Sequence, residues 1–222
     1  GEWKVLKDLY GDENRVWVSY EDIPRNLKSA CIAIEDKRFF EHHGVDLYRT
    51  LGAAANYFLH FGGRFGASTI TQQLIKNITG ADEVSIERKI REMAWALELE
   101  KKFTKDEILE LYLNVINLSD NCYGVGVAAQ RYFSKDVNEL SLIECVAIAA
   151  ITNNPSYYNP IRNPQNNAER RDIILLQMRE QGMISEREFN ESYGMELILD
   201  PNDAAISTGI QSWYVDMVIA DV

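Results

Sequence analysis

The chain of 222 residues is short of cysteine, of positive charge and of long apolar runs, and each shortage excludes a class of protein. Three cysteines without CxxC spacing provide neither a zinc site nor a full disulfide framework. Two of them, Cys31 and Cys145, lie in apolar runs and are expected to be small core residues. There is no signal peptide and no apolar run of about 18 residues, so this chain is not expected to span a membrane. Its abrupt start at Gly1 suits a piece of a longer protein.

Lysine and arginine number 23 against 34 acidic residues, and the net charge of −11 excludes nucleic acid as the main partner. The stretch 61–91 departs from that balance, with five basic and three acidic residues, which leaves a place for an anionic ligand. A hydrophobic content of 46% fits an ordinary folded protein, and the length suits one large domain or two small lobes.

Helical spacing of apolar residues and repeated capping boxes predict a mainly α protein. The stretch 141–151 is apolar all round and is expected to be a buried central helix, and small residues in 123–133 suit close helix packing. Weak alternation predicts a hairpin in 1–20, and 153–164 is expected to be a loop. The predicted helices cover 27–40 (after Pro24), a start at Thr69, 84–102, 108–115, 141–151, 168–181 (ended by Gly182) and a start at Ser185.

An acid pair, Glu35 and Asp36, directly follows the apolar run 31–34. A carboxylate placed where an amphipathic helix leaves the core suits a general acid or base, because partial burial raises the pKa of a carboxyl group toward neutral pH. The alternative for the pair is a solvated, charged turn.

The stretch 66–77, GASTITQQLIKN, contains a capping box from Thr69 to Gln72, so a helix is expected to start there. Thr69, Gln73 and Lys76 then fall on one helical face. Free N–H groups at a helix start, together with hydroxyls and a lysine, form a plausible oxyanion or phosphate site.

The stretch 84–102 is predicted to be a central helix because apolar residues occupy both of its sides. On the second side Arg88 and Glu92 are four residues apart, which suits either a functional carboxylate or a solvated ion pair. The first apolar stripe is Ile86, Ile90, Met93 and Leu97, and the second side reads Arg88, Glu92, Trp95 and Leu99.

The segment 47–65 is rich in aromatic residues and carries only two charges, Arg49 and Arg64. It suits a buried helix with a loop, or a flap that dips into a lipid surface, and the sequence leaves both open.

Four stretches in this order resemble the peptidoglycan glycosyltransferase domain of class A penicillin-binding proteins and their monofunctional relatives: 35–44 (EDKRFFEHHG), 66–77, 88–92 (RKIRE) and 105–114 (KDEILELYLN). The resemblance covers roughly residues 20–195. That family commonly has an aromatic-Gly pair after the YLN motif and a Gly after Tyr-Phe. Here Ile116–Ser119 and Ser134 stand instead, which bears on local loop shape and not on the chemistry.

The resemblance implies a lysozyme-like α fold, with a large head and a smaller membrane-proximal jaw around an extended cleft. It also implies polymerisation of lipid II into β-1,4 glycan strands, with inversion and release of undecaprenyl diphosphate. Glu35 would be the general base and Glu92 the second acid, beside the leaving diphosphate. The substrate-binding residues would be Asp36, Phe39, His42, Ser68, Thr69, Gln72, Gln73, Lys76, Asn77, Arg88 and Lys89. A divalent cation, Mg²⁺ or Mn²⁺, would be held by Asp36 or Glu92.

The same resemblance implies a place in the cell. Residues 1–200 would form the glycosyltransferase domain, and 201–222 a linker toward a transpeptidase domain absent from this chain. The domain would lie on the extracytoplasmic face of the bacterial membrane, anchored by an N-terminal helix not present here. Its partners would be lipid II, the growing glycan strand, the membrane surface, division or elongation proteins and moenomycin-type inhibitors.

Two other functions stay open. A lysozyme-like peptidoglycan hydrolase also needs a catalytic glutamate, but it has little use for Lys76 and the Arg88-Lys89 pair. A non-catalytic glycan-binding module would be expected to lack one of the two acids, yet Glu35 and Glu92 are both present.

Overall fold

The computed structural model describes residues 14–52, 68–80 and 85–203, and over these ranges the chain is mostly helical, which confirms the predicted mainly α class. Two short strands, β1 (Asn14–Arg15) and β2 (Cys122–Tyr123), pair in parallel. The helices are α1 (Arg25–Glu35), α3 (Ile70–Thr79), α4 (Ile86–Lys102), α5 (Lys105–Val115), α6 (Val125–Phe133), α7 (Leu142–Ile151), α8 (Pro164–Glu180) and α9 (Glu186–Ser192), with a 3-10 turn η1 (Val137–Glu139) and a helical stretch at 47–52.

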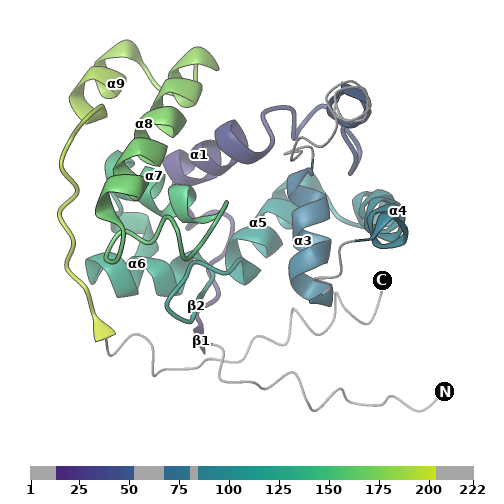
Figure 1. Cartoon of the computed structure of the whole chain (residues 1–222), viewed down its shortest axis with the longest axis horizontal. Helices are drawn as coiled ribbons and strands as arrows, with labels where there is room; N and C mark the ends of the chain where they lie inside the picture. Colours follow the sequence, from purple (N-terminus) through teal and green to yellow (C-terminus); the bar gives the residue numbers. More distant parts are fainter. Residues whose placement is uncertain (1–13, 53–67, 81–84, 204–222) are drawn as a thin grey trace.

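The helices form two groups that α5 connects (Figure 1). In the larger group α7 packs against α1, α6 and α8, and all its residues from Ile143 to Ile151 are buried, so the predicted central helix is confirmed. In the smaller group α3 packs against α4 and α5. Cys31 and Cys145 are buried free thiols on α1 and α7, as expected of small core residues.

Repeated capping boxes were predicted from the sequence; the part of the chain that the structure describes has four at the starts of α-helices, and each fixes where its helix begins. In each box the N-cap hydroxyl accepts a backbone N–H, and a Glu or Gln three residues later reaches back to the N-cap. The boxes begin at Thr69 (α3), Thr104 (α5), Ser141 (α7) and Ser185 (α9).

Two predicted boundaries were wrong, and a predicted hairpin is not tested. The helix expected over 27–40 ends at Glu35, and residues 37–44 form turns instead. Helix α8 begins at Pro164, four residues before its predicted start, because proline is favoured in a first helical turn. The hairpin predicted for 1–20 lies partly outside the described residues, and its described part, β1, pairs with β2.

Helix α4 is not central, which corrects another prediction. Ile86, Ile90 and Leu97 of the first apolar stripe are exposed, by 82%, 61% and 44%, and α4 lies at the edge of the molecule in Figure 1. The opposite side is the buried one and contains Glu92 and Leu99. Glu92 is therefore not part of a solvated surface pair.

Two places where the chain departs from the family pattern have a backbone typical of glycine. Ser119, in the loop after α5, has φ 70°, and Ser134, at the C-terminal end of α6 where the family commonly has Gly, has φ 52°. Asp120 and Asn121 continue the run with φ of 49° and 60°. Side chains other than Gly, Asn and Asp rarely adopt this conformation. Ser134 therefore keeps a left-handed backbone where the family commonly has Gly.

Candidate active site

Glu35 is the last residue of α1, and its side chain is held by two neutral donors. Gln73 Nε2 donates to Oε2 at 2.9 Å, and Thr152 Oγ1 donates to Oε1 at 2.7 Å. The residue is only 9% exposed. A carboxylate that uncharged groups hold in one orientation suits a general base, because these donors fix its position without cancelling its charge.

Tyr112 of α5 supports this arrangement from behind. Its hydroxyl donates to Gln73 Oε1 at 3.2 Å, which leaves the amide nitrogen of Gln73 directed at Glu35. Complete burial, followed by the negative charge of Glu35, raises the pKa of Tyr112 well above its usual value, so the hydroxyl stays protonated. Three helices thus contribute to the setting of one carboxylate.

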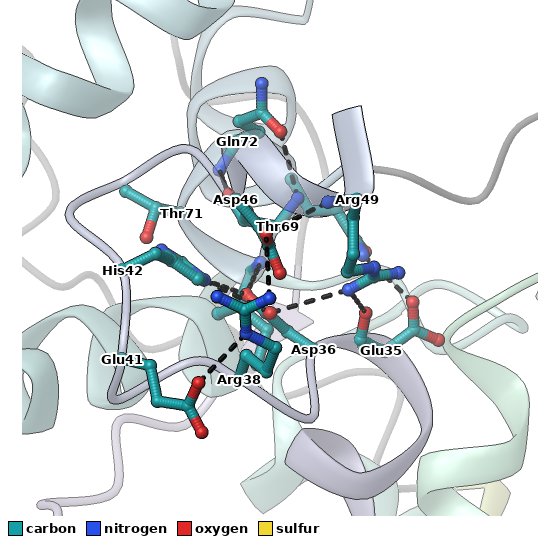
Figure 2. Close-up of polar contacts among 12 residues, drawn as sticks. Glu35, Asp36, Arg38, Glu41, His42, Asp46, Arg49, Thr69, Thr71 and Gln72 are labelled. Atoms are coloured by element: carbon teal, nitrogen blue, oxygen red, sulfur yellow. Dashed lines mark hydrogen bonds and ion pairs between the residues drawn. The ribbon is translucent and has the colours of Figure 1, made fainter. Parts of the chain in front are cut away.

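Asp36 is fully buried and holds neighbouring segments together. Its Oδ2 accepts from the backbone N–H of Ile70, the first residue of α3, at 3.0 Å, and His42 Nε2 lies 3.0 Å from the same oxygen. Arg49 NH1 lies 3.4 Å from Oδ1, and Figure 2 shows Asp36 between His42 and Arg49. A carboxylate at a helix N-terminus is also stabilised by the helix dipole. These contacts fix the start of α3 relative to the end of α1.

Arg49 connects the stretch 47–52 to the end of α1. Its NH1 donates to the main-chain carbonyl of Glu35 at 3.0 Å, and its own backbone N–H donates to Asp46 Oδ1 at 3.0 Å (Figure 2). A cation at the C-terminus of α1 is favourable because the free carbonyls there carry partial negative charge. Arg49 therefore belongs to the setting of Glu35.

Thr69 and Gln72 use their polar groups within the protein. Besides its capping role, Thr69 Oγ1 donates to the carbonyl of Gly44 at 2.6 Å, and both side chains are buried. Gly44 has φ +88°, and a Cβ there would lie 2.5 Å from the carbonyl oxygen of Ala96. The stretches 35–44 and 66–77 and helix α4 are therefore interlocked through backbone contacts.

Glu92 lies on the buried side of α4 between two cations. Arg88 NH1 is 3.0 Å from Oε2, and Lys89 Nζ is 2.5 Å from Oε1. Lys89 also donates to Ser68 Oγ at 2.8 Å. The three charged residues carry a net formal charge of +1, so Glu92 orients the cations without cancelling their charge.

The other residues expected to bind substrate lie in different surroundings. Phe39 is completely buried and packs under Lys105, with Nζ 4.4 Å from the ring centre, so the structure assigns it to the core. His42 is buried against Asp36, and Lys76 and Asn77 are exposed on α3. Most of the segment predicted as a flap, 53–65, lies outside the described residues.

The donors that are present do not fit a divalent cation. Both oxygens of Asp36 and both of Glu92 already contact N–H groups or cationic side chains. Within the described ranges there is no group of three or more His, Cys, Asp or Glu residues arranged to hold a metal ion. Asp36 and Glu92 are therefore not assigned as metal ligands.

Sequence reasoning missed Thr152, Tyr112 and Arg49. Tyr112 lies inside the quoted stretch 105–114, and Arg49 is one of only two charges in 47–65, so both carried a signal. Thr152 had none, because its contact with Glu35 joins residues 117 positions apart.

Comparison with known proteins identifies the family of this chain. A family model described as Transglycosylase matches residues 2–179. The chain is similar to penicillin-binding protein 1A of Clostridium perfringens strain 13 (42% identity, 95% of this chain and 33% of that protein) and to penicillin-binding protein 1F of Bacillus subtilis strain 168 (41% identity, 94% and 29%). It therefore spans a third or less of these curated relatives.

A solved structure, penicillin-binding protein 1A from Haemophilus influenzae, has the same fold, with a TM-score of 0.53 and 24% identity. The match covers 95% of this chain and 21% of that one, and it agrees with the lysozyme-like fold expected from the sequence.

Proposed function

The chain belongs to the transglycosylase family, and from that premise we propose that it is a peptidoglycan glycosyltransferase that polymerises lipid II into β-1,4 glycan strands. The observation that carries the proposal is the setting of Glu35, a nearly buried carboxylate held in place by the uncharged donors of Gln73 and Thr152. Two cations flank Glu92, and in the proposed function their positive charge stabilises the leaving diphosphate.

In the proposed reaction Glu35 takes the proton of the acceptor sugar's 4-hydroxyl as that oxygen attacks the anomeric carbon of the growing strand. The bond from this carbon to the lipid diphosphate breaks, its electron pair leaves with the diphosphate, and the configuration inverts. A diphosphate leaves readily and needs positive charge more than a proton, which Arg88 and Lys89 supply.

The hydrolase alternative has less support. A glycosidase must protonate a poor leaving group and needs a carboxylic acid as well as a carboxylate. Asp36 is committed to Ile70, His42 and Arg49, and Glu92 is committed to two cations. Neither is free to act as that acid.

We also propose that the domain works at the extracytoplasmic membrane surface, as part of a longer anchored protein. Several apolar side chains are exposed on α4 and on the stretch 47–52: Ile86, Ile90, Leu97, Leu47, Tyr48 and Leu51. Aromatic and aliphatic groups of this kind suit a lipid interface. None of the described helices is long and apolar enough to cross a bilayer.

The boundary between domain and linker near residue 200 stays a prediction. Asp200 and Asn202 donate backbone N–H groups to the carbonyls of Tyr132 and Arg131, at 3.0 and 2.9 Å. The first residues of the predicted linker are therefore tied to the end of α6. We propose that residues 201–222 lead from the end of α6 toward a transpeptidase domain, and that the longer protein contacts other cell-wall synthesis proteins.

The proposal is tested by incubating the chain with labelled lipid II and resolving the products on a gel, with Mg²⁺, Mn²⁺ or EDTA. Glycan ladders that moenomycin suppresses are the expected result. Clearing of a cell-wall suspension without ladders would support the hydrolase instead. Ladders should form equally in EDTA, because the described carboxylates do not fit a divalent cation; ladders that need Mg²⁺ or Mn²⁺ would contradict that conclusion.

A further inference from the structure

A threonine outside every stretch that carries the family resemblance touches the proposed base. Thr152 follows α7 directly, and its Oγ1 lies 2.7 Å from Glu35 Oε1 and 2.9 Å from the carbonyl oxygen of Ala149. Helix α7 is buried almost throughout and packs against α1. The central helix of the larger group therefore fixes the position of the Thr152 hydroxyl relative to the Glu35 carboxylate.

The hydroxyl has one hydrogen, and the Glu35 carboxylate and the Ala149 carbonyl are acceptors within reach, while the Tyr112 hydroxyl is a further hydrogen-bond partner. A bond to a charged carboxylate is stronger than one to a neutral carbonyl, so the hydrogen points to Glu35 while that group is ionised. Once Glu35 has taken a proton it accepts more weakly, and the hydroxyl can turn to Ala149. The contact therefore stabilises the base mainly in its reactive, charged form.

We propose that Thr152 is a positioning residue for the general base: together with Gln73 it fixes the plane of the Glu35 carboxylate and favours its ionised form. This inference rests on the function proposed above. Thr152 keeps its own hydrogen throughout, and the only proton transferred passes from the acceptor hydroxyl to Glu35.

Other charged or titratable groups also face Glu35 from the elements packed around it. They are Tyr112 of α5, Cys31 of α1, Asp36 after α1, and Arg49 of the stretch 47–52. A change at Thr152 alters none of these side chains but also removes its hydrogen bond with Tyr112, so a shift in the pH profile reports the loss of the hydroxyl together with its contacts.

The test compares Thr152→Val, Thr152→Ser and the matched control Thr79→Val in lipid II polymerisation. Valine keeps the shape of threonine without the hydroxyl, and serine restores the hydroxyl. Thr79 also donates to a helix carbonyl, that of Ile75 at 2.9 Å, and it has no described contact with Glu35. Rates are measured from pH 5 to pH 9 at saturating and at limiting lipid II.

In Thr152→Val we expect the acidic limb of the kcat profile to move to higher pH by about one unit. At pH values on that limb, kcat of the variant should then be about tenfold lower than kcat of the wild type. KM should stay unchanged, and Thr152→Ser and Thr79→Val should follow the wild type. An unshifted limb in an active, folded Thr152→Val enzyme would overturn the proposal. A wild type that forms no polymer would instead contradict the proposed function itself.

Discussion

Two adjacent carboxylates at the end of α1 have different settings, and this difference assigns their roles. Glu35 receives hydrogen bonds from the uncharged groups of Gln73 and Thr152, whereas Asp36 faces Arg49, His42 and a helix N-terminus. A carboxylate engaged by a cation and a backbone N–H is a structural anchor. Glu35 is left as the group that can exchange a proton with substrate.

Replacing Asp36 with asparagine should therefore act on stability. The variant removes the charge from a buried cluster and is expected to lower the free energy of unfolding by about 3–5 kcal/mol. Denaturant unfolding measures it, with Asp22→Asn as the control because Asp22 is exposed and bonds only to Ser19 among the contacts described. Equal stability of the Asp36 variant and the wild type would remove its anchoring role.

The sequence predicted Glu35, Asp36, Gln73, Arg88, Lys89 and Glu92 as members of one site, and the structure groups them into two contact clusters, one at Glu35 and one at Glu92. What it could not predict were contacts across long separations, such as the one made by Thr152. The burial of Phe39 was not predicted either, because an aromatic pair beside charges gives no sign of which ring enters the core.

At the scale of elements, the site depends on close backbone approach between segments. The turn at Gly44 lies against α4 and accepts a hydrogen bond from Thr69, the N-cap of α3. The end of α1 depends likewise on contacts that sequence periodicity cannot reveal, such as that of its C-cap Asp36 with Ile70, and the helix predicted over 27–40 was therefore extended too far. Capping boxes depend on residues three apart, and these were predicted correctly.

Gly44→Ala should separate these segments. A Cβ at φ +88° costs about 1–2 kcal/mol, and the 2.5 Å approach to Ala96 adds an overpacking cost of about 1–3 kcal/mol. Gly80→Ala is the matched control, since Gly80 has φ +61° and a Cβ added there would meet nothing within 4 Å. Thermal unfolding should show a clearly larger loss at Gly44; equal losses would mean that the contact with α4 is unimportant.

At the scale of the whole molecule, α4 presents opposite faces to two environments. Its inner face holds Glu92, and its outer face exposes Ile86 and Ile90. The sequence showed both apolar sides but could not show which one the fold covers, so α4 was wrongly predicted to be central. The exposed side suits the surface on which a lipid-linked substrate lies.

The double variant Ile86→Asp and Ile90→Asp should weaken association with phosphatidylcholine vesicles by about tenfold or more, because two apolar side chains lose their affinity for lipid. Co-sedimentation measures this. Ile198→Asp is the control, since Ile198 is 79% exposed in the segment after α9. Equal binding by the double variant and the wild type would show that this face does not meet the membrane.

The most direct test of the account is the rate of lipid II polymerisation by Glu35→Gln, measured at saturating substrate. Glutamine keeps the size of the side chain but cannot accept the acceptor's proton, so the rate should fall by about 10²–10⁴-fold, with thermal unfolding and moenomycin binding nearly unchanged. Glu41→Gln is the matched control, because Glu41 is exposed and paired with Arg38, and it should polymerise like the wild type. A Glu35→Gln enzyme with a near-normal rate would contradict the assignment of Glu35 as the general base.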